Sequence, residues 1–160
     1  MVTTIEKYPL ERRKIIKKTV KGSFWACILF LIGPLWLHFF FWETFKFHLI
    51  ILDILFLIYP FVKFLYEREY FKRYFYDARK DFLIIKKGVF APRETILPYE
   101  KLQDVYVDQD VFDRIFKLYD VHVSTATFMS GIEAHIDGVN KENAEAIREI
   151  ILENIRASKK

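Results

Sequence analysis

Two stretches decide the fold of this chain: FWACILFLIGPLWLHFFFW at residues 24–42 and FHLIILDILFLIYPFVKFL at residues 47–65. As an α-helix, each would reach about 28 Å, close to the ~30 Å hydrocarbon thickness of a bilayer. A helix on the surface of a soluble protein would carry polar residues every third or fourth position, and these stretches do not. Gly33-Pro34 and Pro60 lie inside them, and we expect these residues to kink the helices without ending them. With ETFK at 43–46 as the turn, the sequence predicts an antiparallel transmembrane hairpin.

Basic residues flank both apolar stretches on the same side. Residues 1–22 carry seven Lys and Arg, residues 63–80 carry six, and the connecting turn carries only Lys46. Loops rich in Lys and Arg stay in the cytoplasm during membrane insertion. The pattern therefore predicts a multi-pass protein of the cell (inner) membrane with both termini cytoplasmic.

The charge changes sign along the chain, although the whole chain has a net charge of +4. Residues 81–160 hold 11 Lys and Arg against 14 Asp and Glu. A nucleic-acid-binding domain should itself be basic, so this half is not expected to bind nucleic acid. The 52% of hydrophobic residues excludes a disordered chain, and the single cysteine excludes an intramolecular disulfide.

Short strands are predicted in the second half of the chain. Several segments alternate apolar and polar residues or form short apolar runs bounded by turn residues. They are residues 81–87, 89–97 (broken by Pro92), 104–108, 119–125 and 132–136, with Gly88 as a hairpin turn. The aromatic segment 70–76 fits either a first strand or a continuation of the second membrane helix.

A terminal amphipathic helix follows the strands. Asn140 is its expected N-cap, and Ala144, Ile147, Ile151 and Ile155 recur on one face. The expected organisation is a basic segment at 1–22, a transmembrane hairpin at 23–65 and a globular domain at 66–160. The fold class is an α+β membrane protein.

A set of residues in this domain resembles the bacterial pleckstrin-homology-like (bPH2) family of membrane-flanked domains, of the YdbS-like type. The matching residues are Gly88, Arg93, Pro98, Leu102, Gln103, Val105, Val107, Gln109, Arg114 and the segment YDVHV at 119–123. The likeness extends over about residues 20–156. It implies a split β-barrel capped by the C-terminal helix, a membrane-associated role and no catalytic residues. The family often has a glycine a few residues after the arginine, where this chain has Phe116-Lys117-Leu118.

Two ionisable residues inside the apolar stretches are candidates for a functional site. His38 and Asp53 lie at similar depth in an antiparallel hairpin, and charged groups within a membrane are costly. We expect them to form an interhelical pair. That pair could contact a partner or respond to protons, or it could simply lock the hairpin.

Other candidate contacts lie in the flanks and in the globular half. Anionic lipid headgroups could bind to the basic residues after the second apolar stretch, which are Arg68, Lys72, Arg73, Arg79 and Lys80. The same residues also help to set the orientation of the chain in the membrane. Arg93, Gln103 and Gln109 could contact a partner, and the alternative is that these residues serve the fold, with Gln103 and Gln109 satisfying backbone groups at strand edges.

The sequence offers little for catalysis or metal binding. The acidic cluster Asp104, Asp108, Asp110 and Asp113 lacks the glycine and terminal glutamate of a calcium loop, and Asp110 better fits a helix N-terminus. His122 and His135 have no further ligands at zinc spacing. No nucleotide-binding or nucleophile motif is present. We expect no metal, no cofactor and no enzyme activity.

These observations predict a non-catalytic binding or scaffolding module. It would present its domain at the cytoplasmic face of the membrane to membrane lipids and to a protein, a peptide or a second copy of itself. An alternative is an accessory subunit of a transport, envelope-stress or antimicrobial-peptide-resistance system, in which His38 and Asp53 contact a partner.

Overall fold

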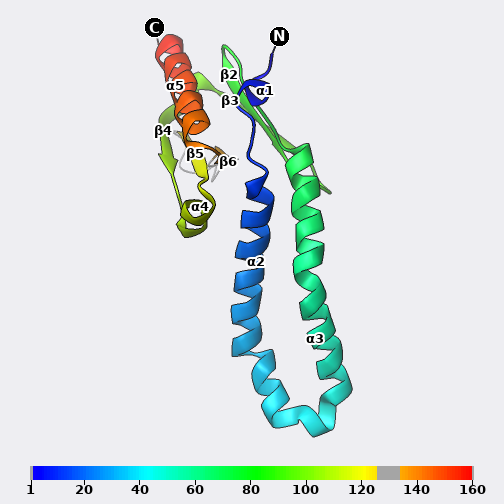
Figure 1. The fold of residues 1–160 in the computed structure, drawn as a ribbon. Coiled ribbons are helices and arrows are strands. Elements are labelled where there is room, and N and C mark those ends of the chain that lie inside the picture. The colour runs from blue at the N-terminus through cyan, green and yellow to red at the C-terminus, as the bar shows by residue number, and fades with distance from the viewer. Residues whose placement is uncertain (1, 126–133, 160) are drawn as a thin grey trace. The chain divides into compact units, whose positions relative to one another are not determined.

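The structure is a computed structural model that describes residues 2–125 and 134–159, apart from the side chains of residues 34 and 35. The chain divides into two compact units (Figure 1). We call residues 15–69 the apolar unit, and residues 1–14 together with 70–160 the globular unit. The sequence did not indicate that the N-terminal residues belong with the second half of the chain.

Two helices, α2 (Arg13–Ile32) and α3 (Pro34–Arg73), build the apolar unit. Phe45 interrupts α3 with non-helical backbone angles (φ −124°, ψ 20°), inside the segment where the sequence predicts a turn. Figure 1 shows α2 beside the later part of α3. The rings of Phe30 and Phe56 stack there, with centroids 4.3 Å apart. The chain therefore reverses its direction within this unit.

One expectation about this unit was wrong. Gly33 and Pro34 do not kink a single helix but separate α2, which ends at Ile32, from α3, which begins at Pro34. Proline suits the first position of a helix because its missing N–H would have no partner there. Pro60 lies inside α3, as expected.

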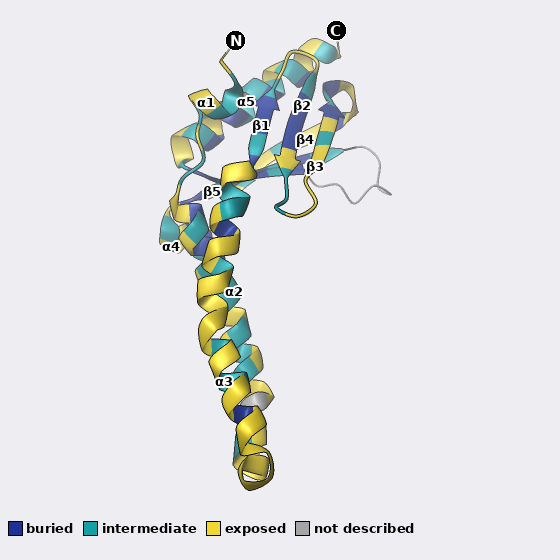
Figure 2. Ribbon diagram, turned by 90° about the vertical axis from the view of Figure 1, so that its right-hand side faces the viewer, coloured by how far each residue is buried: buried dark blue, intermediate teal, exposed yellow. Residues whose placement is uncertain are grey.

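Among the described residues, one helix is long and apolar enough to cross a membrane by length and composition, Trp36–Arg73. Only 6% of its apolar window is buried within the structure, whereas the core helix of a soluble protein is mostly covered. Figure 2 shows most of α2 and α3 as exposed. Helix α2 alone has a shorter apolar part, because its first half is basic and it ends at Ile32.

The described strands of the globular unit form two antiparallel three-stranded sheets, in the orders β1-β2-β3 and β4-β5-β6. The first sheet comprises β1 (Phe75–Ala78), β2 (Phe82–Lys87) and β3 (Arg93–Pro98). The second comprises β4 (Leu102–Asp108), β5 (Tyr119–Thr125) and β6 (Ala134–Val139). A short 3-10 helix, η1 (Tyr99–Lys101), joins β3 to β4, and α4 (Val111–Phe116) joins β4 to β5. Helix α5 (Lys141–Ser158) ends the described chain.

Strand positions agree with the sequence in most places. The segment 70–76 contains both alternatives that were open, since α3 continues to Arg73 and β1 begins at Phe75. Residues 89–92 form no strand, because Gly88 turns the chain with a φ of +119° and β3 begins only at Arg93. Residues 132 and 133 of the last expected strand lie outside the described residues.

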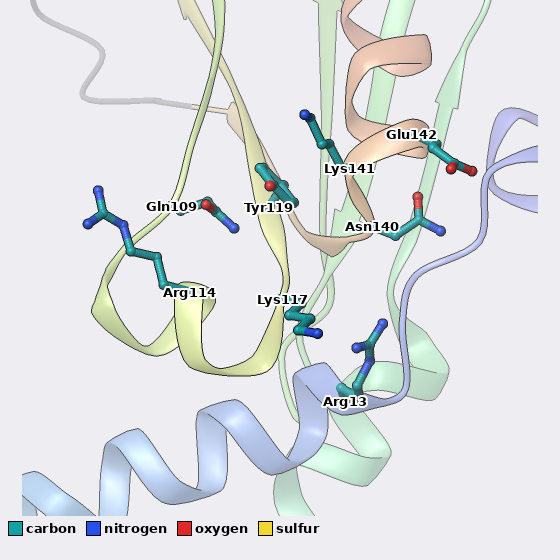
Figure 3. Close-up of a pocket in the computed structure, with 8 residues that line it drawn as sticks. All are labelled: Arg13, Gln109, Arg114, Lys117, Tyr119, Asn140, Lys141 and Glu142. Carbon is teal, nitrogen blue, oxygen red and sulfur yellow. The ribbon is translucent and has the colours of Figure 1, made fainter.

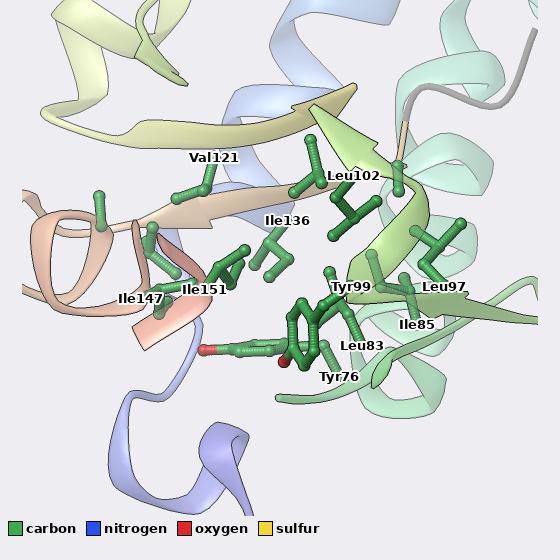
Figure 4. Close-up of a cluster of buried hydrophobic side chains, with 14 of the residues drawn as sticks. Tyr76, Leu83, Ile85, Leu97, Tyr99, Leu102, Val121, Ile136, Ile147 and Ile151 are labelled. Atoms are coloured by element: carbon green, nitrogen blue, oxygen red, sulfur yellow. The ribbon is translucent and has the colours of Figure 1, made fainter. Parts of the chain in front are cut away.

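One core holds the two sheets and α5 together (Figure 4). Tyr76, Leu83 and Ile85 enter it from the first sheet, and Val121 and Ile136 enter it from the second. Helix α5 contributes the face that the sequence predicts: Ala144, Ile147, Ile151 and Ile155. Each fully buried isoleucine contributes about 1.5–3 kcal/mol.

The N-terminal strap, residues 4–14, packs along this globular unit. Its helix α1 (Thr4–Lys7) is fixed by Thr4, whose backbone N–H and hydroxyl both donate to Asp77 Oδ1 at 3.0 Å. The Tyr76 hydroxyl donates to the carbonyl of Tyr8. Further along, Glu11 N donates to the carbonyl of Gly138 in β6 at 2.9 Å. The strap therefore joins β1 of one sheet to β6 of the other.

Candidate functional site

The structure brings His38 and Asp53 together in the apolar unit. His38 Nε2 lies 3.0 Å from Asp53 Oδ2, and the two side chains are 21% and 40% exposed. The imidazole stacks on Trp42, with ring centroids 6.0 Å apart. The pair can therefore satisfy its own hydrogen bond while leaving part of the carboxylate open. Its role in function stays a prediction.

The candidate headgroup residues are all exposed, and they fall on both units. Arg68 belongs to the apolar unit, and the other four belong to the globular unit. Arg73 Nη1 donates to the carbonyl of Val89 at 3.3 Å. Arg79 Nε lies 3.1 Å from Asp77 Oδ2, so its charge is partly used within the protein. Lys72 and Lys80 are exposed at the end of α3 and in the β1–β2 turn.

The three candidate partner contacts do not form one site. Arg93 begins β3 and Gln103 lies exposed on β4. Gln109 is half-buried, and its Nε2 donates to the carbonyl of Leu118 at 2.7 Å. This is the backbone-satisfying role that the sequence suggested for it. Gln109 also lines a cleft.

That cleft lies between α4, β5 and the N-terminus of α5 (Figure 3), and its volume is about 480 Å³. We call it the basic cleft. Four cationic side chains and one carboxylate line it, together with two amides and a tyrosine. These are Arg13, Arg114, Lys117, Lys141, Glu142, Gln109, Asn140 and Tyr119. A second hollow of about 450 Å³ shares four of these residues and adds Val107, Asp108, Glu145 and Arg148, so its charges are more nearly balanced. The excess of positive charge in the basic cleft favours an anionic occupant.

Helix ends shape this cleft. Asn140 caps α5 as expected, since its Oδ1 accepts from Asn143 N at 2.7 Å. Asp110 caps α4 in the same way, accepting from Asp113 N at 2.7 Å. The helix dipole gives the N-terminus of α5 a partial positive charge, which adds to that of the lysines and arginines.

Lys117 takes an unusual conformation at the rim of the cleft. Its φ of 54° and ψ of 47° place it in the left-handed region, directly after α4. Glycine normally fills this position because side chains are disfavoured there. A non-glycine residue therefore makes this turn, and it adds a cation to the cleft.

A buried ion pair fixes the strap beside Arg13. Lys14 Nζ donates to Asp137 Oδ1 at 2.5 Å, and the two side chains are only 1% and 4% exposed. The ammonium also lies 3.7 Å from the centroid of the Tyr74 ring. Burial and the charge of Asp137 raise the pKa of Tyr74 well above its usual value. Gly138 (φ +80°) leaves the necessary space, since a Cβ there would lie 2.6 Å from Lys14 Cδ.

Histidines gather on the second sheet without forming a metal site. The His122 ring stacks between Tyr106 and His135, with centroid separations of 5.0 and 5.5 Å. His122 Nε2 lies 3.2 Å from Asp108 Oδ1. Within residues 2–125 and 134–159, no group of three or more His, Cys, Asp or Glu could hold a metal ion.

Sequence reasoning missed the basic cleft as a whole. It singled out Gln109 for a partner, Asn140 for a helix cap and Arg114 for the family resemblance. Nothing in the sequence indicated that Arg13 would join them, because the docking of the strap depends on contacts more than 120 residues apart, such as Lys14 with Asp137.

Comparison with known proteins gives one match. The bacterial PH domain family matches residues 22–155. No curated protein and no solved structure shows significant similarity to the chain. The family match covers most of the chain, including most of α5 and most of the apolar unit. We conclude that this chain belongs to the bacterial PH domain family.

Proposed function

We propose that this protein is a membrane-anchored, non-catalytic binding module whose basic cleft receives an acidic segment of a protein partner. The observation that carries this proposal is the cleft, where four cationic side chains face one carboxylate. Membership of a PH-like family supports a binding role over catalysis, and the domain needs no cofactor for it.

The anchor is the apolar unit. Its exposed, apolar surface would be unfavourable in water and suits lipid. The reversal at Phe45 supports two crossings, in which the first includes both α2 and the beginning of α3. The basic flanks then keep both termini, and with them the globular unit, in the cytoplasm.

Topology can be tested with one cysteine. In a Cys27→Ala background, Ala157→Cys on the exposed face of α5 is treated in intact cells with a membrane-impermeant maleimide. Protection until lysis is the expected result. Labelling of intact cells would place the domain outside and contradict the proposal.

The cleft can be tested by photo-crosslinking in cells. A photoreactive amino acid at Arg114 should trap a partner, whereas the same residue at Arg156, exposed on α5, serves as the control. Adding Arg13→Glu and Lys117→Glu should abolish the Arg114 product. Equal products at both positions, or a product indifferent to charge reversal, would contradict the proposal.

A second candidate role rests on the open side of Asp53. Its side chain remains 40% exposed in the apolar unit despite its bond to His38. An accessory subunit of a transport or envelope-stress system could use this carboxylate against a partner's helices. Asp53→Asn should then reduce co-purification of that partner in mild detergent, and unchanged recovery would count against this role.

A further inference from the structure

Two apolar protrusions stand out on the globular unit. The first is the loop between β2 and β3, residues 88–92, where Phe90 is 90% exposed. The second is α4, where Val111 and Ile115 are 71% and 66% exposed. Val111 and Ile115 are four residues apart and so lie on the same face of α4. Contact with lipid or protein would remove this apolar area from water, which is favourable.

Cations lie next to both protrusions. Lys87 precedes the loop and Arg93 follows it, while the neighbouring Glu94 is paired with Lys86. Arg114 and Lys117 lie on and just after α4, whose acidic residues Asp110 and Asp113 are engaged in its N-terminal cap. An apolar tip among basic residues matches the chemistry of a bilayer interface with anionic headgroups, because the tip enters the acyl region while the cations stay at the phosphates.

The protrusions lie at one end of the globular unit. Figures 1 and 2 both show α4 and the β2–β3 loop at the same end of this unit. This is also the end at which the chain leaves the unit and returns to it. Arg13, one residue before the boundary, shares the basic cleft with Lys117. Arg73, three residues after the chain returns at Tyr70, donates to Val89 in the loop.

Chain connectivity then limits the distance to the membrane. Arg73 follows Leu65, the last residue of the second apolar stretch, by only eight residues, a length of chain that can span at most about 28 Å. If the apolar unit is embedded, as the proposed function requires, the two protrusions are held within reach of the bilayer surface.

We propose that this end of the globular unit dips into the anionic leaflet, with Phe90 on one side and Val111 and Ile115 on the other. This inference depends on the proposed membrane anchor. Both apolar protrusions contact lipid. The domain is therefore attached to the membrane at three places: the β2–β3 loop, α4 and the chain that connects it to the apolar unit.

The test uses the full chain in proteoliposomes of phosphatidylcholine and phosphatidylglycerol. In the Cys27→Ala background, a small fluorophore is attached to Phe90→Cys, to Ile115→Cys or to the control Ala157→Cys on α5. Lipids that carry a quenching nitroxide on the acyl chain report contact with the hydrocarbon. Trp25, Trp36 and Trp42 in the apolar unit provide an internal reference.

We expect the labels at positions 90 and 115 to be quenched several-fold more than the label at 157. Quenching of the tryptophans without quenching at 90 and 115 would overturn the dipping and leave the anchor intact. Absence of quenching at the tryptophans as well would overturn both. Protection of position 90 from aqueous iodide without nitroxide quenching would show protein contact instead, and would also overturn the inference.

Discussion

The buried pair of Lys14 and Asp137 offers the sharpest test of how the strap is held. Asp137→Asn keeps the size of the side chain but removes its charge, so the buried Lys14 ammonium would lose the carboxylate that lies closest to it. Both side chains are almost fully covered, at 1% and 4% exposure, and Gly138 packs directly against the lysine side chain. The substitution therefore acts on charge, with little change in packing.

The magnitude follows from this burial. Removing one partner of a buried ion pair costs about 3–5 kcal/mol, because the remaining charge has lost its compensation. The Tyr74 ring, 3.7 Å from the ammonium, remains in the variant and partly compensates the buried charge once the carboxylate is gone. We therefore expect a loss near the lower end, about 3 kcal/mol. For a domain of this size, that corresponds to a fall in Tm of more than about 10 °C.

Proteolysis can measure this loss in the full chain in mild detergent. Arg12, Arg13 and Lys14 are trypsin sites that open when the strap leaves the sheets. Cleavage in this segment, followed over a urea series, reports strap release, while near-ultraviolet circular dichroism of the core tyrosines reports global unfolding. The double variant Lys14→Met with Asp137→Leu should recover much of the stability, since an apolar pair can replace a buried ion pair.

Two results would refute this reasoning. If Asp137→Asn is cleaved at the same urea concentration as the parent chain, the pair does not hold the strap. If the double variant is as unstable as Asp137→Asn, the loss comes from packing around β6 and not from the uncompensated charge.

Three further predictions concern single residues. Lys117→Gly should stabilise the globular unit by about 0.5–1 kcal/mol in urea unfolding, because a left-handed residue is relieved, and it should also weaken cleft binding; a destabilised variant would show that the lysine itself supports the turn. Burial of Asp77 opposes its ionisation, but hydrogen bonds from Thr4 and Arg79 outweigh this and lower its pKa. Its contribution to stability is therefore complete above the unfolded pKa of about 3.9 and is lost as the pH falls below it, so acid unfolding curves of Asp77→Asn should be flatter than those of the parent; parallel curves would contradict the assignment. Asn140→Ala should cost about 1 kcal/mol in thermal unfolding by removing the cap of α5, and Asn140→Asp, the matched control, should lose little.

Local pattern was enough to predict much of the globular unit. The alternation of Val121 and Val123 indicated the buried face of β5, and the spacing of Ile147, Ile151 and Ile155 indicated the buried face of α5. Asn140 was predicted as a cap because its side chain and the helix start are adjacent in sequence. In each case the feature depends on neighbouring residues or on a periodic pattern, and the structure contains the predicted buried faces and the predicted cap.

The cleft and the strap could not be predicted in this way. Their contacts depend on residues that approach only after the two sheets are formed, and neither Lys14 nor Arg13 differs in sequence from the other basic residues before the first apolar stretch. The break at Gly33 was misjudged for a related reason. Glycine and proline are tolerated inside membrane helices, and the sequence does not say whether the chain bends there or starts a new helix.

The docking of the strap on β6 also has a consequence for synthesis. Residues 4–14 are made before either sheet, and two of their partners, Asp137 and Gly138, follow more than 120 residues later. Closing so large a loop is slow, so the segment must wait undocked while the apolar stretches are inserted. A nascent chain that stops before β6 would therefore expose Arg12 and Arg13 to proteases, and the arrival of β6 would be the step that protects the N-terminus from degradation.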